Sequence, residues 1–199
     1  MNCGSITGVA RPRSISDERL LSATGAVISK VGPGFTLAQV AREAGVAVGS
    51  VAQRFGSKKG LLRALSKVGR VEVVTRMRDA AAAAPGPREA LLDALVTVYA
   101  GLDDAATAAN SLGQLAADLA DEELRALLGE HYAAMEAELR GLVLRAMDTG
   151  WRGPEPGLAA RTLLATVNGA AIDWSIRPRG DLTQRLRADL ESIVGSWYA

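Results

Sequence analysis

The pattern of apolar and polar positions predicts helices along almost the whole chain. Apolar residues recur at steps of three and four, which is the spacing of one face of an α-helix. The clearest example is 36–44, where Leu37, Val40, Ala41 and Ala44 share a face. The same steps predict further helices over about 16–31, 47–56, 57–84, 87–102, 104–119, 121–142, 158–176 and 181–197. The expected fold class is all-α, with about nine helices.

Strong local signals mark both ends of the helix at 36–44. The Thr36 hydroxyl can accept a hydrogen bond from the Gln39 amide while the Gln39 side chain reaches back, which is a capping box. Phe35 and Val40 flank this cap and can form a hydrophobic staple. Gly45 follows the last apolar position and can adopt the left-handed conformation that ends a helix.

A second helix begins almost directly after this turn. Ala41 is small enough for two helices to cross closely, and Gly45 allows the turn. Val51 of the second helix can then pack an apolar side chain at the crossing. These residue types at this spacing are typical of a helix-turn-helix. The preceding helix, capped by Ser16, has an apolar face that can cover the pair. Residues 16–56 are therefore expected to form a three-helix unit.

The net charge of +1 hides a strong asymmetry along the chain. The residues up to Arg70 include eleven basic and three acidic side chains, so this part carries +8 and the remainder −7. The asymmetry suggests a polyanion-binding head on a body that repels the same polyanion. Lys58 and Lys59 also lie at a helix start, where the dipole disfavours cations and a phosphate would be favourable. The alternative for the charge asymmetry is chance clustering on solvated faces. The alternative for the two lysines is that solvent screens them.

Composition narrows the class of protein further. The chain is 48% hydrophobic but only 4% aromatic, so Ala and Leu must fill a helical core. Its one cysteine, Cys3, excludes an intramolecular disulfide and a cysteine-based metal cluster. Neither a signal peptide nor a membrane-spanning run is recognisable, so a cytoplasmic protein is expected. With one histidine and no Walker loop, we expect no enzyme, cofactor or metal site.

The segment TLAQVAREAGVAVGSVAQRFGSKKGLL, residues 36–62, resembles the DNA-binding domain of TetR-family transcriptional regulators. Chain length, helix count and the two final helices extend this resemblance beyond the N-terminal third. It implies a head that binds double-stranded operator DNA as part of a homodimer, and a helical bundle that binds a small-molecule effector. It also implies a DNA-binding domain (15–60) and a ligand-binding and dimerisation domain (61–199). The segment before them (1–14) has little apolar material, so we expect a disordered basic tail whose Arg11 and Arg13 can touch DNA.

The resemblance also assigns DNA contacts residue by residue. The assigned residues are Thr36, Arg42, Val48, Gly49, Ser50, Gln53, Arg54 and Lys58. This chain departs from the family at Ala47, where a capping serine is usual, and at Ala52, where a tyrosine commonly contacts the DNA backbone. Base readout must then rest on Ser50 and Gln53 with Arg54 or Arg42, and Val48 can contact thymine methyl groups. Much of the affinity should come from phosphates and depend steeply on salt.

The last two predicted helices carry candidate dimer contacts. These are Ala165, Gly169 and Asp173 on the penultimate helix, and Leu182, Leu186, Leu190, Ile193 and Trp197 on the last. Small residues allow a second backbone to approach closely, and a continuous apolar stripe needs a partner. Because operators with two-fold symmetry require two heads about 34–36 Å apart, an isologous dimer through these helices is expected. The alternative is that both stripes face the rest of the same chain.

Candidate ligand contacts are polar or aromatic side chains on the middle helices. They are Tyr99, Asn110, Gln114, His131, Met135, Asn168 and Trp174, and they could orient a mostly apolar molecule in a bundle cavity. Core packing or a satisfied buried polar group is the alternative for each. The function predicted is a ligand-responsive homodimeric repressor that a small, mostly apolar molecule releases from its operator. The competing hypothesis is a helical small-molecule-binding protein or enzyme with a vestigial helix-turn-helix.

Overall fold

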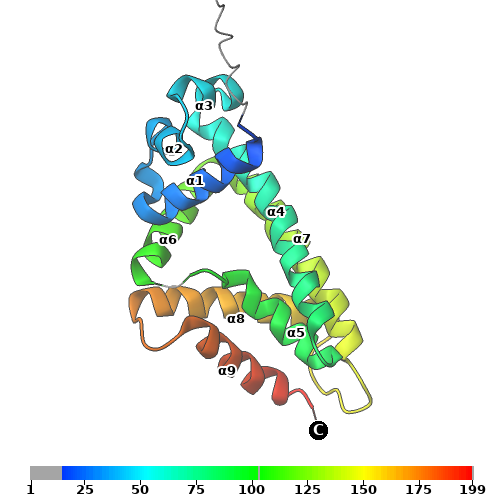
Figure 1. Cartoon of the computed structure of the whole chain (residues 1–199). Helices are drawn as coiled ribbons and strands as arrows, with labels where there is room; N and C mark the ends of the chain where they lie inside the picture. Colours follow the sequence, from blue (N-terminus) through cyan, green and yellow to red (C-terminus); the bar gives the residue numbers. More distant parts are fainter. Residues whose placement is uncertain (1–14, 103, 199) are drawn as a thin grey trace, which may run out of the picture.

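The computed structural model describes residues 15–102 and 104–198, and within them it contains nine α-helices (Figure 1). In chain order these are α1 (Asp17–Val31), α2 (Leu37–Ala44), α3 (Val48–Phe55), α4 (Lys58–Ala83), α5 (Pro87–Val96), α6 (Ala105–Ala120), α7 (Glu122–Ala146), α8 (Pro156–Ile176) and α9 (Leu182–Gly195). Short 3-10 turns follow α1 (Gly32–Gly34) and α5 (Thr97–Tyr99). The all-α fold expected from the sequence is confirmed. The basic tail at 1–14 lies outside the described residues.

The helices form a head and a body that are joined along two sides (Figure 1). The head consists of α1, α2, α3 and the first turn of α4. The body contains α5, α8, α9 and the far ends of α4 and α7. On one side α4 and α7 run next to each other from head to body, and on the other α6 contacts both α1 and α8. A displacement of α6 or α7 can therefore reach the head.

Local sequence signals explain the shape of the head. The Thr36 and Gln39 capping box is present, with the Gln39 amide donating to the Thr36 hydroxyl at 3.3 Å. Gly45 ends α2 in the left-handed conformation at φ +72°. Phe35 and Val40, the two residues of the expected staple, are both buried in the core of the head. The helix-turn-helix predicted at these residues is thus formed, with a turn that glycine makes possible.

The head core also takes in residues from outside the helix-turn-helix. Leu61 and Leu62 of α4 belong to it, as does Leu124 of α7, while Leu127 packs against it. The start of α7 therefore completes the head's core, although the sequence places it in a different region of the chain.

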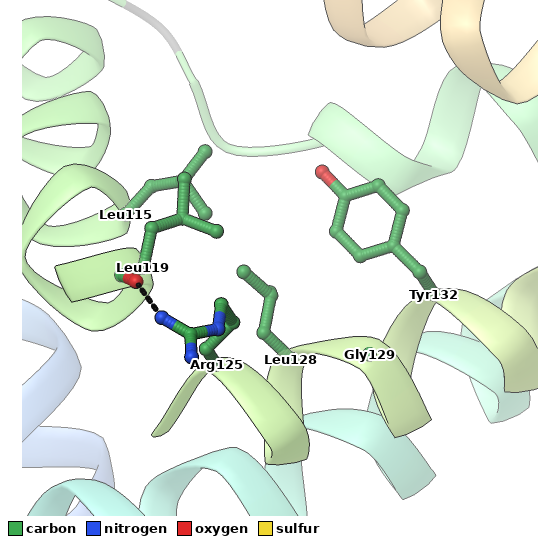
Figure 2. A pocket seen from close by; sticks show the side chains of 6 residues that line it. All are labelled: Leu115, Leu119, Arg125, Leu128, Gly129 and Tyr132. Atoms are coloured by element: carbon green, nitrogen blue, oxygen red, sulfur yellow. Dashed lines mark hydrogen bonds between the residues drawn. The ribbon is translucent and has the colours of Figure 1, made fainter. Parts of the chain in front are cut away.

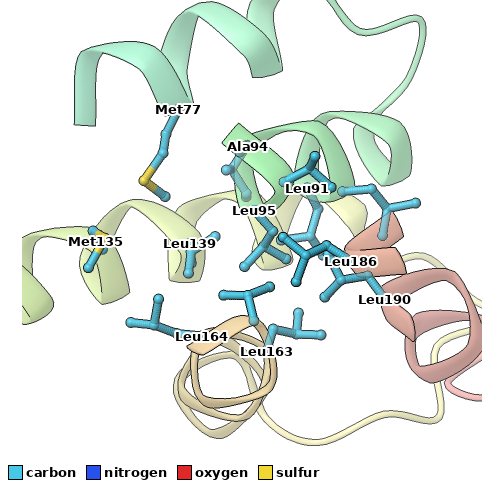
Figure 3. Packing of buried hydrophobic residues seen from close by; sticks show 14 of the residues in the cluster. Met77, Leu91, Ala94, Leu95, Met135, Leu139, Leu163, Leu164, Leu186 and Leu190 are labelled. Carbon is cyan, nitrogen blue, oxygen red and sulfur yellow. The ribbon is translucent and has the colours of Figure 1, made fainter. Parts of the chain in front are cut away.

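A second and larger core fills the body (Figure 3). Six helices meet there, and they contribute Met77 of α4, Leu95 of α5, Ala108 of α6, Leu139 of α7, Leu163 of α8 and Leu190 of α9. Figure 3 shows Leu186 and Leu190 pointing from α9 toward α5 and α8. The last helix is consequently an integral part of the body.

This packing contradicts the predicted dimer contacts at the three leucines of the last helix. Leu182, Leu186 and Leu190 are only 3%, 1% and 0% exposed within a single protomer. Ile193 and Trp197 are half-buried and pack against the same core. The alternative, in which the stripe faces its own chain, holds for the three leucines, because α9 packs against α5 and α8.

Three ion pairs along α4 and α7 show that these helices run in parallel. Arg63 pairs with Glu123 at 2.8 Å, Arg78 pairs with Glu138 at 2.7 Å, and Arg70 pairs with Glu130 between them. Exposed pairs of this kind contribute little stability individually. Their matching spacing along both helices shows the register of the two helices that join head and body.

Replacing Gly45 with alanine should destabilise the protein by about 1–2 kcal/mol, because a Cβ is unfavourable in the left-handed conformation. Gly25 provides a matched control, since it lies inside α1 and an added Cβ would meet no atom within 4 Å. Gly25→Ala should instead stabilise by about 0.5–1 kcal/mol through helix propensity. Urea unfolding of both variants measures the difference, and equal effects would contradict this account of the turn.

Candidate functional site

The first turn of α3 is an exposed helix start of the head. Val48 is 50% exposed, and Gly49 and Ser50 are also exposed. Ala47 stands at the N-cap and supplies no side-chain hydrogen bond, in line with the missing capping serine. The first amides of a helix lack intrahelical partners and form the positive end of its dipole. This end of α3 can therefore bind a surface that carries negative charge or hydrogen-bond acceptors.

The other candidate DNA contacts lie on three helices of the head. Thr36 at the start of α2, Arg42 on α2 and Gln53 on α3 are exposed. Lys58 is half-buried: its ammonium donates to the Pro33 carbonyl and lies 4.2 Å from the centre of the Phe35 ring. These contacts fix Lys58 beside the start of α2.

Arg54 is held against α1 and is not a free side chain. Its guanidinium donates to the Ile15 carbonyl and forms an ion pair with Asp17. Both partners lie at the start of α1, so Arg54 ties α3 to that helix. The sequence could not reveal this contact, because Arg54 and Asp17 are far apart along the chain.

Lys59 has intramolecular partners in place of the expected phosphate. Its ammonium lies 2.9 Å from the Asp121 carboxylate and 3.3 Å from that of Glu123. The hydrogen bonds to these two carboxylates raise the pKa of Lys59. The unfavourable cation at the start of α4 is thus compensated from within the chain.

Asp121 has a second structural role beside its contact with Lys59. Its carboxylate accepts hydrogen bonds from the amides of Glu123 and Leu124 and so caps α7. The pKa of Asp121 is lowered, chiefly by its hydrogen bond to Lys59. The capped start of α7 is therefore bonded directly to the start of α4.

The head is thus a helix-turn-helix with an exposed helix start, carried on a helical body. Residues 20–65 match the family model described as bacterial regulatory proteins, tetR family. The N-terminal region thus carries the TetR-family DNA-binding domain, and the resemblance inferred from residues 36–62 is confirmed. Among curated proteins, none matches this sequence.

Solved structures of similar fold cover nearly the whole chain. A TetR transcription regulator from Haloarcula marismortui superimposes with a TM-score of 0.77 at 16% identity, over 92% of this chain and 98% of that one. A transcriptional regulator from Rhodococcus sp. Rha1 has a TM-score of 0.71 at 23% identity, with 92% and 97% covered. The TetR-family regulator PfmR from Thermus thermophilus has a TM-score of 0.66 at 18% identity, over 89% of this chain and 97% of that one. The chain has the fold of TetR-family regulators.

The structure does not bring the seven candidate ligand residues around one cavity. Tyr99 donates to the Asn168 side chain at 2.6 Å, which satisfies both groups. Asn110 donates to the Ser29 carbonyl at 2.8 Å. Burial raises the pKa of the Tyr99 hydroxyl, which therefore stays a donor. For these three residues the structure favours the alternative of satisfied polar groups.

Trp174 and Met135 are likewise occupied by packing. The Trp174 indole donates to the Gly180 carbonyl at 3.1 Å, and its side chain is 4% exposed. Met135 is 2% exposed and belongs to the body core. Both were expected at a ligand, and both are instead core residues because α7 and α8 pack against each other there.

Of the two remaining candidates, His131 lines a pocket and Gln114 does not line it. His131 lines a pocket of about 160 Å³ between α4, α6 and α7, together with Asp118. Gln114 is buried and donates to Asp118 at 2.7 Å. Burial raises the pKa of Asp118, whereas burial and the nearby Arg70 and Arg76 lower the pKa of His131.

A larger neighbouring pocket was not anticipated from the sequence (Figure 2). Its volume is about 310 Å³, and it is lined by Leu115, Leu119, Arg125, Leu128, Gly129 and Tyr132. The residues come from α6 and α7, where these helices meet. Helical periodicity identifies the faces of each helix but not which faces stay apart, so no sequence signal marked this pocket.

Two further observations concern the described residues. No group of three or more histidine, cysteine, aspartate or glutamate side chains among them is placed to hold a metal ion. None of their helices combines the length and apolar character needed to cross a membrane.

Lowering the pH from 7.5 to 5.5 should destabilise the protein through His131. Its folded-state pKa is lowered, so the unfolded chain takes up a proton near its ordinary value of 6.5 while the folded chain resists it. Stability is therefore lost as the pH falls through that value. His131 is the only histidine. Urea unfolding at both pH values should show a smaller loss in His131→Gln, and an equal loss would contradict this assignment.

Proposed function

We propose that this protein is a homodimeric transcriptional repressor that binds operator DNA through α3 and is released by a small, mostly apolar molecule. The observation that carries the proposal is the exposed first turn of α3 in a head whose sequence matches the TetR-family DNA-binding domain. An uncapped, exposed helix start with cations around it fits a DNA groove between two phosphate backbones.

Two kinds of contact would contribute to DNA binding. Thr36, Arg42 and Lys58 would meet phosphates, which supply affinity without sequence information. Ser50 and Gln53 would read base edges, with the exposed Val48 side chain against thymine methyl groups. With Val48 and Gly49 unable to form bidentate contacts, the affinity of the head should come mainly from phosphates.

Arg54 would act mainly on the position of α3. Its ion pair with Asp17 and its bond to the Ile15 carbonyl would be lost if it reached into the groove. We assign it the role of holding α3 against α1, with any contact to a phosphate made from that position.

The exposed face of α8 is the surface that supports a homodimer. Ala165 and Gly169 are exposed at its centre, and Ile172 and Ile176 are 42% and 72% exposed toward its end. Small residues in the middle allow a second α8 to approach closely, and the isoleucines supply apolar area. Asp173 is held by Arg177 and Arg185 beside this face. An isologous pair of α8 helices would place two heads on one DNA duplex.

The meeting point of α6 and α7 offers a route from ligand to head. The 310 Å³ pocket lies there, a few residues from Asp121 and Glu123. These two carboxylates bind Lys59 and Arg63 in the first two turns of α4. A ligand that binds better when α6 and α7 are displaced would therefore shift α4 and the head. A coupling of about 1–3 kcal/mol changes DNA affinity about 5- to 150-fold.

Binding to the DNA that flanks its own coding sequence tests the DNA-binding proposal. The logarithm of the association constant should fall steeply with the logarithm of salt concentration. Arg42→Ala and Lys58→Ala should each weaken binding across sequences and reduce this slope by about one. Arg179→Ala, an exposed cation between α8 and α9, is the matched control and should leave binding unchanged. A flat salt response would favour the vestigial head.

Gly169→Arg should convert the dimer to a monomer, because a long cation in each copy would prevent close approach of the two α8 helices. An added Cβ at Gly169 meets no atom within 4 Å in the protomer, so the fold should be retained. Sedimentation velocity should report monomer mass, and DNA affinity should fall. Ala137→Arg on the exposed side of α7 should remain dimeric. A dimeric Gly169→Arg would exclude α8 as the interface.

A further inference from the structure

The pocket between α6 and α7 has walls that are almost entirely apolar. Leu115 and Leu119 of α6 face Leu128 of α7 across it (Figure 2). Its volume of about 310 Å³ lies at the lower end of the roughly 300–1,000 Å³ of ligand pockets. The pocket therefore suits a small molecule with a largely apolar body.

Two polar side chains of α7 lie along the pocket, and the helix surface between them is open. Arg125 and Tyr132 are seven residues apart, which corresponds to about 10 Å along a helix. Gly129 lies between them, and a Cβ added there would meet no atom within 4 Å. A chain-like molecule can consequently lie over Gly129 with one end at Arg125 and the other at Tyr132.

Both polar side chains can donate hydrogen bonds at neutral pH. The Arg125 guanidinium carries a permanent charge, and one of its nitrogens donates to the Leu119 carbonyl at 3.0 Å. That bond holds the cation at the edge of the pocket. Burial raises the pKa of Tyr132, so its hydroxyl keeps its proton.

Carboxylates do not compete for Arg125 within the pocket. The side chains that line it include no aspartate or glutamate. Asp118, which lines the adjacent pocket, is bonded to Gln114, and Asp121, one turn before Arg125, is paired with Lys59. The combination of one cation, one hydroxyl donor and apolar walls is complementary to an amphipathic anion.

We propose that this pocket binds an apolar carboxylic acid, with the carboxylate at Arg125 and the apolar chain over Gly129 toward Tyr132. The ligand is thereby assigned to the monoanionic class. The assignment rests on the proposed function, since the pocket is the effector site of the proposed repressor.

Three probes that differ only in the head group test the assignment: decanoate, decan-1-ol and decylamine. Each is titrated calorimetrically into the full-length protein below its micelle-forming concentration. Decanoate should bind at least about tenfold more tightly than the alcohol or the amine, because hydrogen bonds to a charged group are the stronger ones. Arg125→Gln should remove that preference and leave binding of the alcohol unchanged. Arg125→Lys should restore part of it.

A second variant tests the location independently of charge. Gly129→Leu places a side chain in the open part of the pocket, in a helix that favours leucine over glycine. It should abolish decanoate binding. Ala137→Leu adds the same side chain to the exposed side of α7 and should bind decanoate like the unmodified protein.

The results separate this site from the proposed function. Equal binding of the three probes, tighter binding of decylamine, no binding of decanoate, or a preference that survives in Arg125→Gln would each overturn the carboxylate site. Decanoate binding that remains in Gly129→Leu would do the same. DNA binding is measured on the same samples. A protein that binds decanoate as described but keeps its DNA affinity unchanged supports the site and contradicts the ligand response.

Discussion

The contact between the start of α7 and the start of α4 is one of the two that position the head on the body. Asp121 caps α7 and binds Lys59, while Glu123 binds both Lys59 and Arg63. Leu124 follows directly and is buried in the head core. Polar and apolar contacts of α7 thus hold the head in one orientation, and the ion pairs further along α4 carry this register into the body.

The burial of α9 decides which surface remains for a second copy. Because Leu186 and Leu190 fill the core of the body, α9 stabilises the protomer and cannot also offer that stripe to a partner. The outer face of α8 keeps Gly169 and the two isoleucines exposed. The apolar pattern of α9 looked like an interface in the sequence, since periodicity reports that a face is buried but not what covers it.

The head combines a well-formed scaffold with few base-reading side chains. The capping box at Thr36 and the turn at Gly45 hold α2 and α3 in place. At the exposed start of α3, however, Ala47, Val48 and Gly49 contribute almost no hydrogen-bonding groups, and Arg54 is bonded to α1. In the proposed DNA complex, backbone amides and cations would then supply most of the contacts, and the expected sequence preference is modest.

The sequence by itself determined the features that depend on neighbouring residues. Helix ends at Ser16, Thr36 and Gly45 follow from caps and a left-handed glycine, and the helix-turn-helix follows from their spacing. Tertiary structure alone decided which candidate residues are free. It joined Lys59 to Asp121, satisfied Tyr99 with Asn168, and left a pocket beside Arg125. The two contacts link residues about 60 positions apart or more, and the pocket depends on where α6 and α7 separate. The apolar period of a single helix contains no information about either.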